Sequence, residues 1–501
     1  MTYFPQVARQ ETAFGELLVA QVTPQVQAKF PYNLNTDIVQ VLVCGTGSSV
    51  AVSGGMCTVT CAAVAEKFAQ IRTLDVIRYG PGQGALFRGT CLFTNNAALS
   101  SQVFGPGDDE EGLFFGYNGT SFGVLRRSFG ELEIRSLTIT GAADAGGGTF
   151  TITMDGTPVT VTVGASDTIA EVCAAIVALT DEFGDAGRGW EVHTDDNVSV
   201  EFISLVAENA TGTFSFADVD SGVTAGTFTQ ATTVVAGVAP TETWVAQASW
   251  NVDVMDGTGP SGMTLDPTKL NVYQIRYQFL GSGEIDYGIE DPATGKIVVV
   301  HRIKYTNTAI IPTLKNPTFH ITMIAKTEAG FSGSALVMKT ASLAGFIEGQ
   351  ETKLGVRHSA SNSKTTTGAT QLNVLTIHSE IDWQGTRNKV FVYPDFLTIA
   401  SEATKTVTIR ARLNPTEVSG TVALTAIDAN TSVMEKDTAG LLVVGGTTLF
   451  EFTLSGAGAR ETNLKPLNMF LRPGDRWAFT CSLSSGAEGV VTVGVTWLER
   501  I

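Results

Sequence analysis

The feature that most constrains this chain is the alternation of apolar and polar residues over short runs that end at Gly, Pro or Asn. The runs "DIVQVLVCGTG" (37–47) and "KTVTIRARLN" (405–414) show it clearly. Such alternation places one face of a strand in a core and the other in water, as in antiparallel sheets. A composition with 53 Gly and only 16% charged residues also favours strands and tight turns over long surface helices. The sequence therefore predicts a mostly β fold.

The length of 501 residues is too great for one ordinary core, since about 150 residues per domain is typical. Strand runs predict an antiparallel β-sandwich made of residues 1–135 plus 244–350, which we call the main sandwich. A second, evenly spaced series of strand runs without helices predicts a C-terminal β-sandwich over residues 389–501. Between them, the polar run "RHSASNSKTTTGATQ" (357–371) predicts a linker or long loop over residues 351–388.

The segment between the two halves of the main sandwich has a different sequence pattern. Residues 136–243 open with two strand runs around the turn "DG" and continue into the one convincing helix pattern, "SDTIAEVCAAIVALTDEF" (166–183). Thr168 and Glu171 in this run have the spacing of a capping box. Further strand runs follow. This order predicts an inserted small α+β module of the type ββαββ.

A glycine motif raises the question of nucleotide binding. The stretch "DGTGPSGMTLDPTK" (256–269) contains Gly257, Gly259 and Gly262 at the spacing of a dinucleotide-binding turn. That turn requires a helix that begins inside the motif. Here Pro267 and a run rich in Val, Tyr, Ile and Phe follow instead, and they predict another strand. We therefore expect a tight loop between two strands and no nucleotide.

The charge of the chain limits its partners. The net charge is −17, from 32 Lys plus Arg against 49 Asp plus Glu. This charge repels nucleic-acid phosphate over most of the surface, so we expect no nucleic-acid partner. The first residues lack a basic segment followed by an apolar one, and no window of about 18 residues is apolar throughout. We therefore expect synthesis in a cytoplasm, no secretory signal and no membrane span.

Residues suited to catalysis or metal binding are few. The five histidines include no pair at HxH or HxxxH spacing, and "GFSGSAL" (330–336) lacks the GxSxG order of serine hydrolases. Six cysteines without a CxxC pair favour buried thiols. The acidic run "GPGDDEEG" (105–112) lacks the alternate spacing of a calcium loop and favours a solvated turn. Asp253 and Asp256 are better placed for calcium, because a bend can converge carboxylates, but we expect no metal, no cofactor and no enzyme.

The main sandwich also contains four distinctive stretches: "FGELLVAQVTPQVQAKFPYNLNTD", "RYGPGQGALFRGTCLFT", "GLFFGYNGTSFGVLRR" and "WNVDVMDGTGPSGMTLDPTKLNVYQIRYQFLGSGEIDYGIEDPATGKIVVVHRIKY". Over roughly residues 12–350 the chain resembles virion structural proteins of tailed phages and large algal DNA viruses. The resemblance implies a concanavalin-A-like lectin sandwich with an insert beginning near "LTITGAA", and it implies no catalytic residues. The C-terminal sandwich is similar only in general terms to viral jelly-roll and fibre-tip domains.

Two functions follow from this resemblance. The first is a virion structural protein, an exposed fibre, spike or tail-associated subunit with host-glycan (receptor) binding. The alternative is a minor capsid or cementing protein with a purely structural role. In both, the protein is assembled in the host cytoplasm, resides in the virion and contacts other virion proteins. Low charge density and many strand edges also predict a homo-oligomer, and analogy with viral fibres suggests a trimer.

A glycan site needs hydrogen-bonding side chains beside an exposed aromatic ring. The run "GLFFGYNGTSFG" (112–123) and the glycine loop offer both, although alternation places most large aromatic residues in the core. We therefore predict shallow, non-catalytic glycan contacts by Tyr117, Asn118, Asp253 and Asp256. The alternative is structural: Tyr117 and Asn118 shape a hairpin, and the two aspartates cap a turn.

Overall fold

The computed structural model describes residues 22–94, 96–183, 189–194, 198–218, 226–229, 234–350, 355–367, 370–419, 423–467, 469–484 and 488–499. Within these ranges α1 (Ile169–Val177) is the single α-helix, and the other long elements are strands. The prediction of a mostly β fold is therefore confirmed. Helices in the same ranges are all too short or too polar to cross a membrane.

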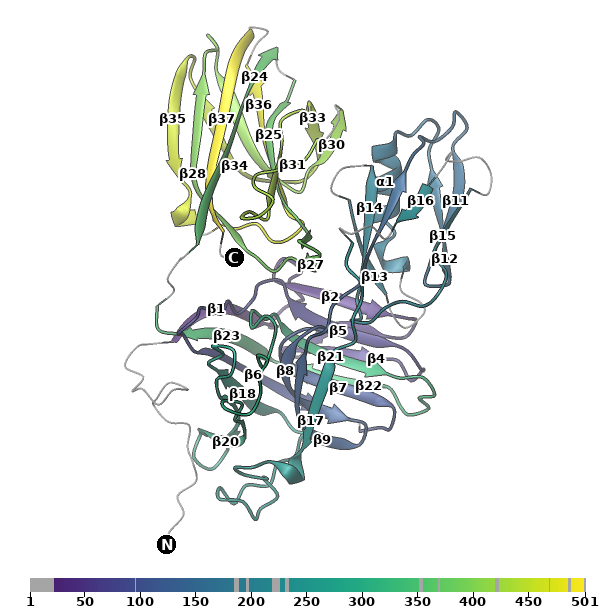
Figure 1. The fold of residues 1–501 in the computed structure, drawn as a ribbon, viewed down its shortest axis with the longest axis vertical. Helices are drawn as coiled ribbons and strands as arrows, with labels where there is room; N and C mark the ends of the chain where they lie inside the picture. The colour runs from purple at the N-terminus through teal and green to yellow at the C-terminus, as the bar shows by residue number, and fades with distance from the viewer. Residues whose placement is uncertain are drawn as a thin grey trace.

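Two antiparallel sheets form the main sandwich, which comprises residues 22–128 and 241–348. Its elements are β1 (Val22–Lys29), β2 (Val39–Cys44), β3 (Ser49–Ser53), β4 (Met56–Cys61), β5 (Phe68–Thr73), β6 (Ala85–Phe93), β7 (Ser100–Pro106), β8 (Gly112–Asn118), β9 (Ser121–Ser128), β17 (Thr241–Ala246), η2 (Gln247–Ser249), β18 (Asn271–Tyr277), β19 (Ile285–Asp291), β20 (Lys296–Ile303), β21 (Ile321–Thr327), β22 (Leu336–Thr340) and β23 (Ser342–Glu348). The nine-stranded sheet follows the path β20-β19-β18-β6-β22-β4-β3, and β23 pairs with both β6 and β1. The seven-stranded sheet has the order β17-β9-β8-β7-β21-β5-β2 (Figure 1).

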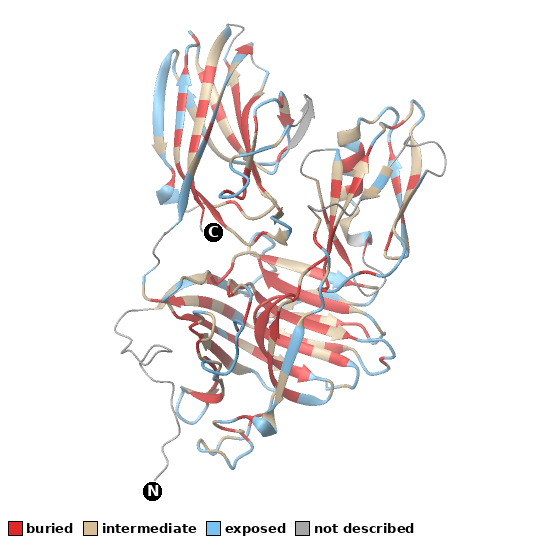
Figure 2. Cartoon of the chain, in the orientation of Figure 1, coloured by how far each residue is buried: buried red, intermediate tan, exposed pale blue. Residues whose placement is uncertain are grey.

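Large aromatic side chains from both sheets meet in the middle of the main sandwich. The ring centroid of Phe115 on β8 lies 4.9 Å from that of Tyr273 on β18 and 5.4 Å from that of Tyr287 on β19. Phe87 on β6 and Phe104 on β7 meet edge to face at 5.1 Å. All five are fully buried, and buried positions recur along the strands of both sheets (Figure 2). Burial of such rings contributes strongly to holding the two sheets together.

The insert lies between β9 and β17. Its elements are β10 (Ile134–Ile139), β11 (Gly148–Met154), β12 (Thr157–Val163), α1, η1 (Thr180–Glu182), β13 (Trp190–His193), β14 (Ser199–Ser204), β15 (Ser215–Asp218) and β16 (Gly226–Thr229). The strands form a four-stranded sheet, β13-β14-β10-β16, and a three-stranded sheet, β12-β11-β15. Val172, Cys173 and Ile176 of α1 are buried in the same core as Phe150 and Phe202. An α+β insert is thus present, with more strands than the predicted ββαββ pattern.

The sequence predictions for the helix and the borders of the insert are confirmed only in part. The capping box is present: Thr168 N donates to Glu171 Oε2 at 2.8 Å, and Glu171 N donates to Thr168 Oγ1 at 3.3 Å. However, β10 already begins at Ile134, and β17 belongs to the main sandwich from Thr241 onward. The predicted borders at residues 136 and 243 therefore cut two strands, because the apolar pattern continues across both.

The C-terminal sandwich begins at β24. Its elements are β24 (Val356–Thr367), β25 (Leu372–Ser379), β26 (Asp382–Trp383), β27 (Thr386–Arg387), β28 (Val392–Ser401), β29 (Val407–Leu413), β30 (Thr416–Ser419), β31 (Thr425–Ala426), β32 (Met434–Asp437), β33 (Leu442–Val444), β34 (Thr447–Leu454), β35 (Gly458–Asn463), η3 (Lys465–Leu467), β36 (Arg476–Leu483) and β37 (Glu488–Glu499). The sheets β24-β37-β28-β35 and β31-β32-β25-β36-β29-β34 share one core, in which Trp477 on β36 and Trp497 on β37 are fully buried.

The prediction of a linker over residues 351–388 is wrong where β24 and β25 lie. β24 pairs with β37 along its whole length, from Val356 opposite Glu499 to Thr367 opposite Glu488. β24 is an edge strand, so one long neighbour supplies its backbone hydrogen bonds while most of its side chains face water. Its composition is therefore polar although its conformation is extended.

The insert and the C-terminal sandwich lie on the same side of the main sandwich (Figure 1). Ion pairs join both to it: Arg72 on β5 lies 3.2 Å from Glu191 on β13, and Lys389 lies 3.1 Å from Asp108. The main sandwich is thus the base on which the other two units rest.

Candidate functional site

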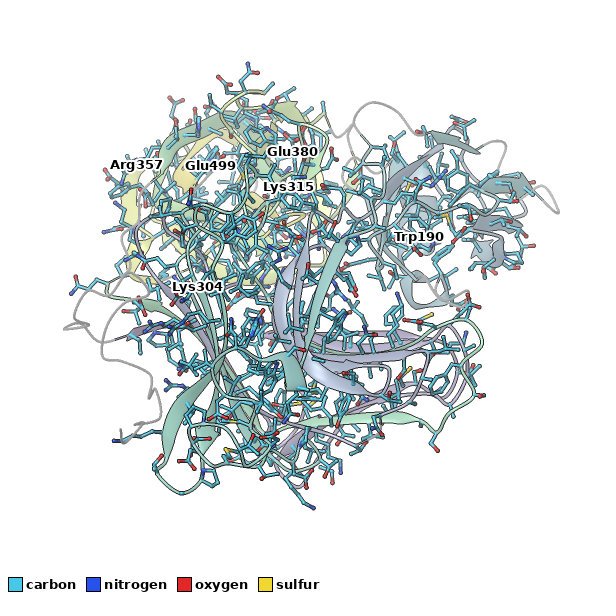
Figure 3. All side chains as sticks on the ribbon, turned by 60° about the horizontal axis from the view of Figure 1, so that its bottom comes forward. Trp190, Lys304, Lys315, Arg357, Glu380 and Glu499 are labelled. Carbon is cyan, nitrogen blue, oxygen red and sulfur yellow. The ribbon has the colours of Figure 1, made fainter. Side chains whose placement is uncertain are left out.

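A cleft of about 720 Å³ opens at the edge of the main sandwich. It lies beside β17 and β20, which are edge strands of the two sheets, and beside the glycine loop 256–262. The lining residues are Arg126, Thr243, Val245, Asn251, Val252, Pro260, His301, Arg302, Ile303, Lys304 and Tyr305. All of these residues belong to the main sandwich; Figure 3 labels Lys304 among them, apart from Trp190 of the insert. The cleft is therefore a feature of the main sandwich alone.

Arg126 supplies one charged wall of this cleft. It lies on β9 opposite Thr243 of β17, and its Nη2 donates to the Thr243 hydroxyl at 3.3 Å. Its guanidinium carbon lies over the ring of Tyr305, 5.2 Å from the centroid, in a cation–π arrangement. Its Nε is buried without a hydrogen-bond partner among the described residues. A buried N–H without an acceptor is unfavourable, so this donor of Arg126 is unused among the described residues.

The opposite wall is built by Asn251 and the end of β20. The Asn251 side chain accepts from Arg302 N at 2.9 Å and donates to Arg302 O at 2.8 Å, which fixes the chain beside β20. Asn251 N donates to His301 Nδ1 at 3.3 Å, so Nδ1 carries a lone pair and the proton of the neutral ring sits on Nε2. Burial lowers the pKa of His301 below its ordinary value. His301 is therefore a neutral donor at pH 7.

Arg302 is compensated by carboxylates that do not line the cleft. Its Nε lies 2.7 Å from Asp286 Oδ1 and 2.8 Å from Glu284 Oε1. Burial alone would lower the pKa of Arg302, but these two carboxylates raise it above its usual value. Arg302 is thus a fixed cation whose position is set by Asp286 and Glu284.

The glycine loop forms the remaining rim, and Asp253 shapes it. Asp253 is 2% exposed; its Oδ1 accepts from Met255 N at 2.9 Å and its Oδ2 accepts from Ser261 N at 2.7 Å. A Cβ on Gly259 would lie 2.0 Å from Asp253 Oδ1, so the close approach requires glycine. The predicted tight loop is present, a strand follows it, and no helix begins within this described segment. Asp253 thereby positions Pro260 at the cleft.

The four predicted glycan contacts do not form one open site. Tyr117 is buried against Phe93 and Phe122, and burial raises the pKa of its hydroxyl. Tyr117 and Asp253 are buried and, unlike His301, do not line the cleft, because their side chains complete the core and the loop. These two contact predictions are corrected on that ground.

The other two predicted contacts are exposed. Asn118 ends β8 at the hairpin to β9, opposite Ser121. Asp256 accepts from the backbone N and the hydroxyl of Thr258 at 2.9 and 2.6 Å, and these hydrogen bonds lower its pKa. Both have the turn-shaping geometry of the structural alternative, and a glycan contact by either stays a prediction.

Sequence reasoning missed the residues that do line the cleft. His301, Arg302, Lys304 and Tyr305 follow directly on the apolar run "IVVV" at the end of β20. Cationic side chains and an aromatic ring directly after an apolar run are a local signal for a polar site at the end of a strand. No local signal connects them to Arg126, because that contact forms only when the two sheet edges meet.

A second polar cluster lies where the three units meet, around a small cavity of about 130 Å³. Asp108, Glu110 and Glu111 of the acidic run are each only 2% exposed, so the prediction of a solvated turn is wrong. Lys389 lies 3.1 Å from Asp108 and 2.8 Å from Glu110. Lys389 lies 281 residues from Asp108 in the sequence, so local sequence patterns could not predict this pairing. The described residues contain no group of three or more His, Cys, Asp or Glu side chains that could hold a metal ion.

Comparisons with known proteins give only distant likenesses. No family model and no curated protein matches the chain. Among solved structures, it is similar to the cellulose-induced protein Cip1, with a TM-score of 0.27 and 8% identity over 64% of this chain and 96% of that one.

Two further solved structures are similar at the same low level. One is the exoplasmic/lumenal domain of VIP36 in its Ca²⁺/Man3GlcNAc-bound form, with a TM-score of 0.23 and 10% identity over 66% of this chain and 92% of that one. The other is the triple jelly-roll protein of an archaeal virus turret assembly, with a TM-score of 0.19 and 8% identity over 96% and 97% of the two chains. At TM-scores below 0.5, none of these likenesses indicates a function for this chain.

Proposed function

We propose that this protein is a structural subunit of a virus particle, an exposed fibre, spike or tail-associated component, whose main sandwich binds a carbohydrate of the host cell in the cleft. The cleft between β17, β20 and the glycine loop is the observation that carries the binding role. The particle role rests on the stretches that resemble virion proteins.

The chemistry of the cleft suits a sugar. Tyr305 provides an aromatic surface against which the apolar face of a sugar ring can pack. Arg126 and the neutral His301 provide N–H donors to its hydroxyl oxygens. Loop and strand hydrogen bonds to Asn251 and Asp253 hold the walls in place, which lowers the entropic cost of binding. The cleft is a concave surface with a few fixed polar groups, as ligand sites commonly are.

A single cleft of this kind binds weakly, because it is open and offers few donors. Several copies on one particle would raise the effective affinity by avidity. The proposed homo-oligomer would therefore serve binding as well as assembly.

One observation favours the alternative of a minor capsid or cementing protein. Leu280, Ile310 and Ile311 are 55%, 103% and 56% exposed, and their two loops are joined by the hydrogen bond from Thr313 N to Gly281 O. Exposed apolar side chains that gather on neighbouring loops are typical of protein contacts. Such a contact is compatible with a particle subunit that binds no sugar.

A glycan array separates the two functions. We expect the intact protein to bind a subset of glycans and Tyr305→Ala to lose that binding, while Tyr32→Ala retains it. Tyr32 is 93% exposed and does not line the cleft, so it is a matched control. If the intact protein binds no glycan, or if Tyr305→Ala binds equally well, the carbohydrate role is wrong and the cementing role is favoured. Locating the subunit in the density of the particle would test the virion assignment independently.

A further inference from the structure

We infer that the cleft selects an anionic sugar, one that carries a carboxylate or a sulfate group. This inference rests on the proposed function and specifies its ligand class. Three cations line the cleft, Arg126, Arg302 and Lys304, and no Asp or Glu does. In a chain with 49 acidic and 32 basic residues, a lining without a carboxylate is a local excess of positive charge, which Asp286 and Glu284 reduce by pairing with Arg302.

Arg126 is the cation best prepared for an anion. It forms no ion pair within the described part of the chain, and the nearby acid Glu242 is occupied by Arg127 at 2.7 Å and by Trp244 Nε1 at 3.1 Å. The Tyr305 ring and the Thr243 hydroxyl hold its guanidinium in one orientation. Guanidinium binds carboxylate and sulfate oxygens through parallel N–H donors, and the buried Nε is the donor still without an acceptor.

The other two cations contribute differently. Lys304 is exposed and forms no ion pair among the described residues, although it acts electrostatically on Glu284. Arg302 is already neutralised by Asp286 and Glu284, so it orients a ligand more than it attracts one. The uncompensated attraction therefore comes from Arg126 with Lys304.

The rest of the molecule limits the size of the anion. A net charge of −17 repels an extended polyanion, whereas one charged group on a small saccharide needs only the cations of the cleft. The neutral donor His301 and the Tyr305 ring suit the uncharged remainder of a sugar. Together these features favour a singly charged sugar over a nucleic acid or an inorganic anion.

The test compares three small sugars that differ in one group: lactose, 3′-sialyllactose and 3′-sulfolactose, each titrated into the full chain. We expect both charged sugars to bind more tightly than lactose, by roughly tenfold or more, and to lose this advantage at high salt. Arg126→Gln should abolish the preference; because Arg126 also donates to sugar hydroxyls, the readout is the ratio of the affinities for the charged sugars and for lactose. Arg460→Gln is the matched control, since Arg460 also lies over an aromatic ring but on β35 of the C-terminal sandwich.

The outcomes separate the anionic-ligand inference from the proposed carbohydrate binding. Equal binding of lactose and both charged sugars, or an unchanged preference in Arg126→Gln, would overturn the anionic ligand and leave the proposed function intact. Absence of binding by all three sugars and by the glycan array would contradict both. Sialyl and sulfo sugars binding unequally would identify which anion the cleft takes. If Arg126→Gln does not fold, the exposed Lys304→Gln keeps the inference testable, because it must still reduce the preference and its dependence on salt.

Discussion

Replacing Lys389 with Met tests how the C-terminal sandwich is joined to the main sandwich. The Nζ atom of Lys389 lies 2.8 Å from Glu110 Oε2 and 3.1 Å from Asp108 Oδ2, and the side chains of Lys389, Glu110 and Asp108 are 12%, 3% and 3% exposed. Burial alone would lower the pKa of Lys389, but the two carboxylates raise it above its usual value. The lysine is therefore charged in the folded protein, and Met would leave two buried carboxylates without their main cation.

The partners that Asp108 and Glu110 keep in Lys389→Met determine how much stability is lost. Removing one partner of a buried ion pair costs about 3–5 kcal/mol. Asp108 Oδ1 keeps hydrogen bonds from Glu110 N and Glu111 N at 2.9 and 3.0 Å, and Glu110 keeps Arg387 at 3.7 Å. These remaining partners place the expected loss at the lower end, about 3 kcal/mol in the free energy of unfolding at pH 7.

The loss also depends on pH. Burial alone would raise the pKa of Asp108, but Lys389, Arg387 and His320 hold it well below its ordinary value. A carboxyl group with a lowered folded pKa adds stability above its unfolded pKa of about 3.9, and this stability disappears as the pH falls further. The difference between wild type and Lys389→Met should therefore be largest at pH 7 and shrink below about pH 4.

Urea unfolding followed by tryptophan fluorescence measures this difference in the free energy of unfolding, since Trp477 and Trp497 lie in the core of the C-terminal sandwich. Each transition is fitted separately, because a chain with several cores need not unfold in two states. Lys405→Met is the control: Lys405 is exposed and makes no ion pair among the described residues. If Lys389→Met and Lys405→Met differ by less than about 0.5 kcal/mol at pH 7, the buried pair does not stabilise the junction.

Three further predictions concern the units and their assembly. Replacing residues 133–236 with a short Gly/Ser bridge should leave the main sandwich folded, because β9 and β17 stay paired; loss of all cooperative unfolding would contradict this. Gly116→Ala should destabilise by about 1–3 kcal/mol or more in thermal unfolding, since its Cβ would lie 1.8 Å from Gln102 O, whereas Gly458→Ala, with nothing within 4 Å, should change stability little. Light scattering at micromolar concentration should show an oligomer, with a trimer expected, and a strictly monomeric mass would refute it.

Much of the fold was predictable because the signals were local. Cys57, Val59 and Cys61 alternate into the core along β4, as their period-2 spacing predicts, and all six cysteines are buried. The turn "DG" joins β11 and β12 with Asp155 and Gly156 both at positive φ, as in the tight turns of two-residue hairpins. Each of these features depends on residues within a few positions of one another.

The failures share one physical cause, which is a partner distant in the sequence. The sequence around Asp108 predicts a solvated turn, but Lys389, 281 residues later, pairs with it. The sequence of β24 predicts a linker, but the strand pairs with β37. The cleft was missed for the same reason, since Arg126 and Tyr305 meet only through tertiary structure. Sequence patterns predict which face of a strand is buried, but they do not predict which strand or side chain lies beside it.

The positive charge of the cleft follows from the strand period itself. Arg126 and Arg127 are consecutive on β9, so their side chains point to opposite faces of the seven-stranded sheet. Arg127 points to the outer face, where it pairs with Glu242 at 2.7 Å and with Asp109 at 3.3 Å. Arg126 points to the inner face near the sheet edge, out of reach of those acids. Neutralising Arg126 with the same carboxylates would require a one-residue slip of β9, which would also turn Leu125 and Val124 to the wrong faces. The apolar core therefore fixes the register that keeps Arg126 free of acidic partners.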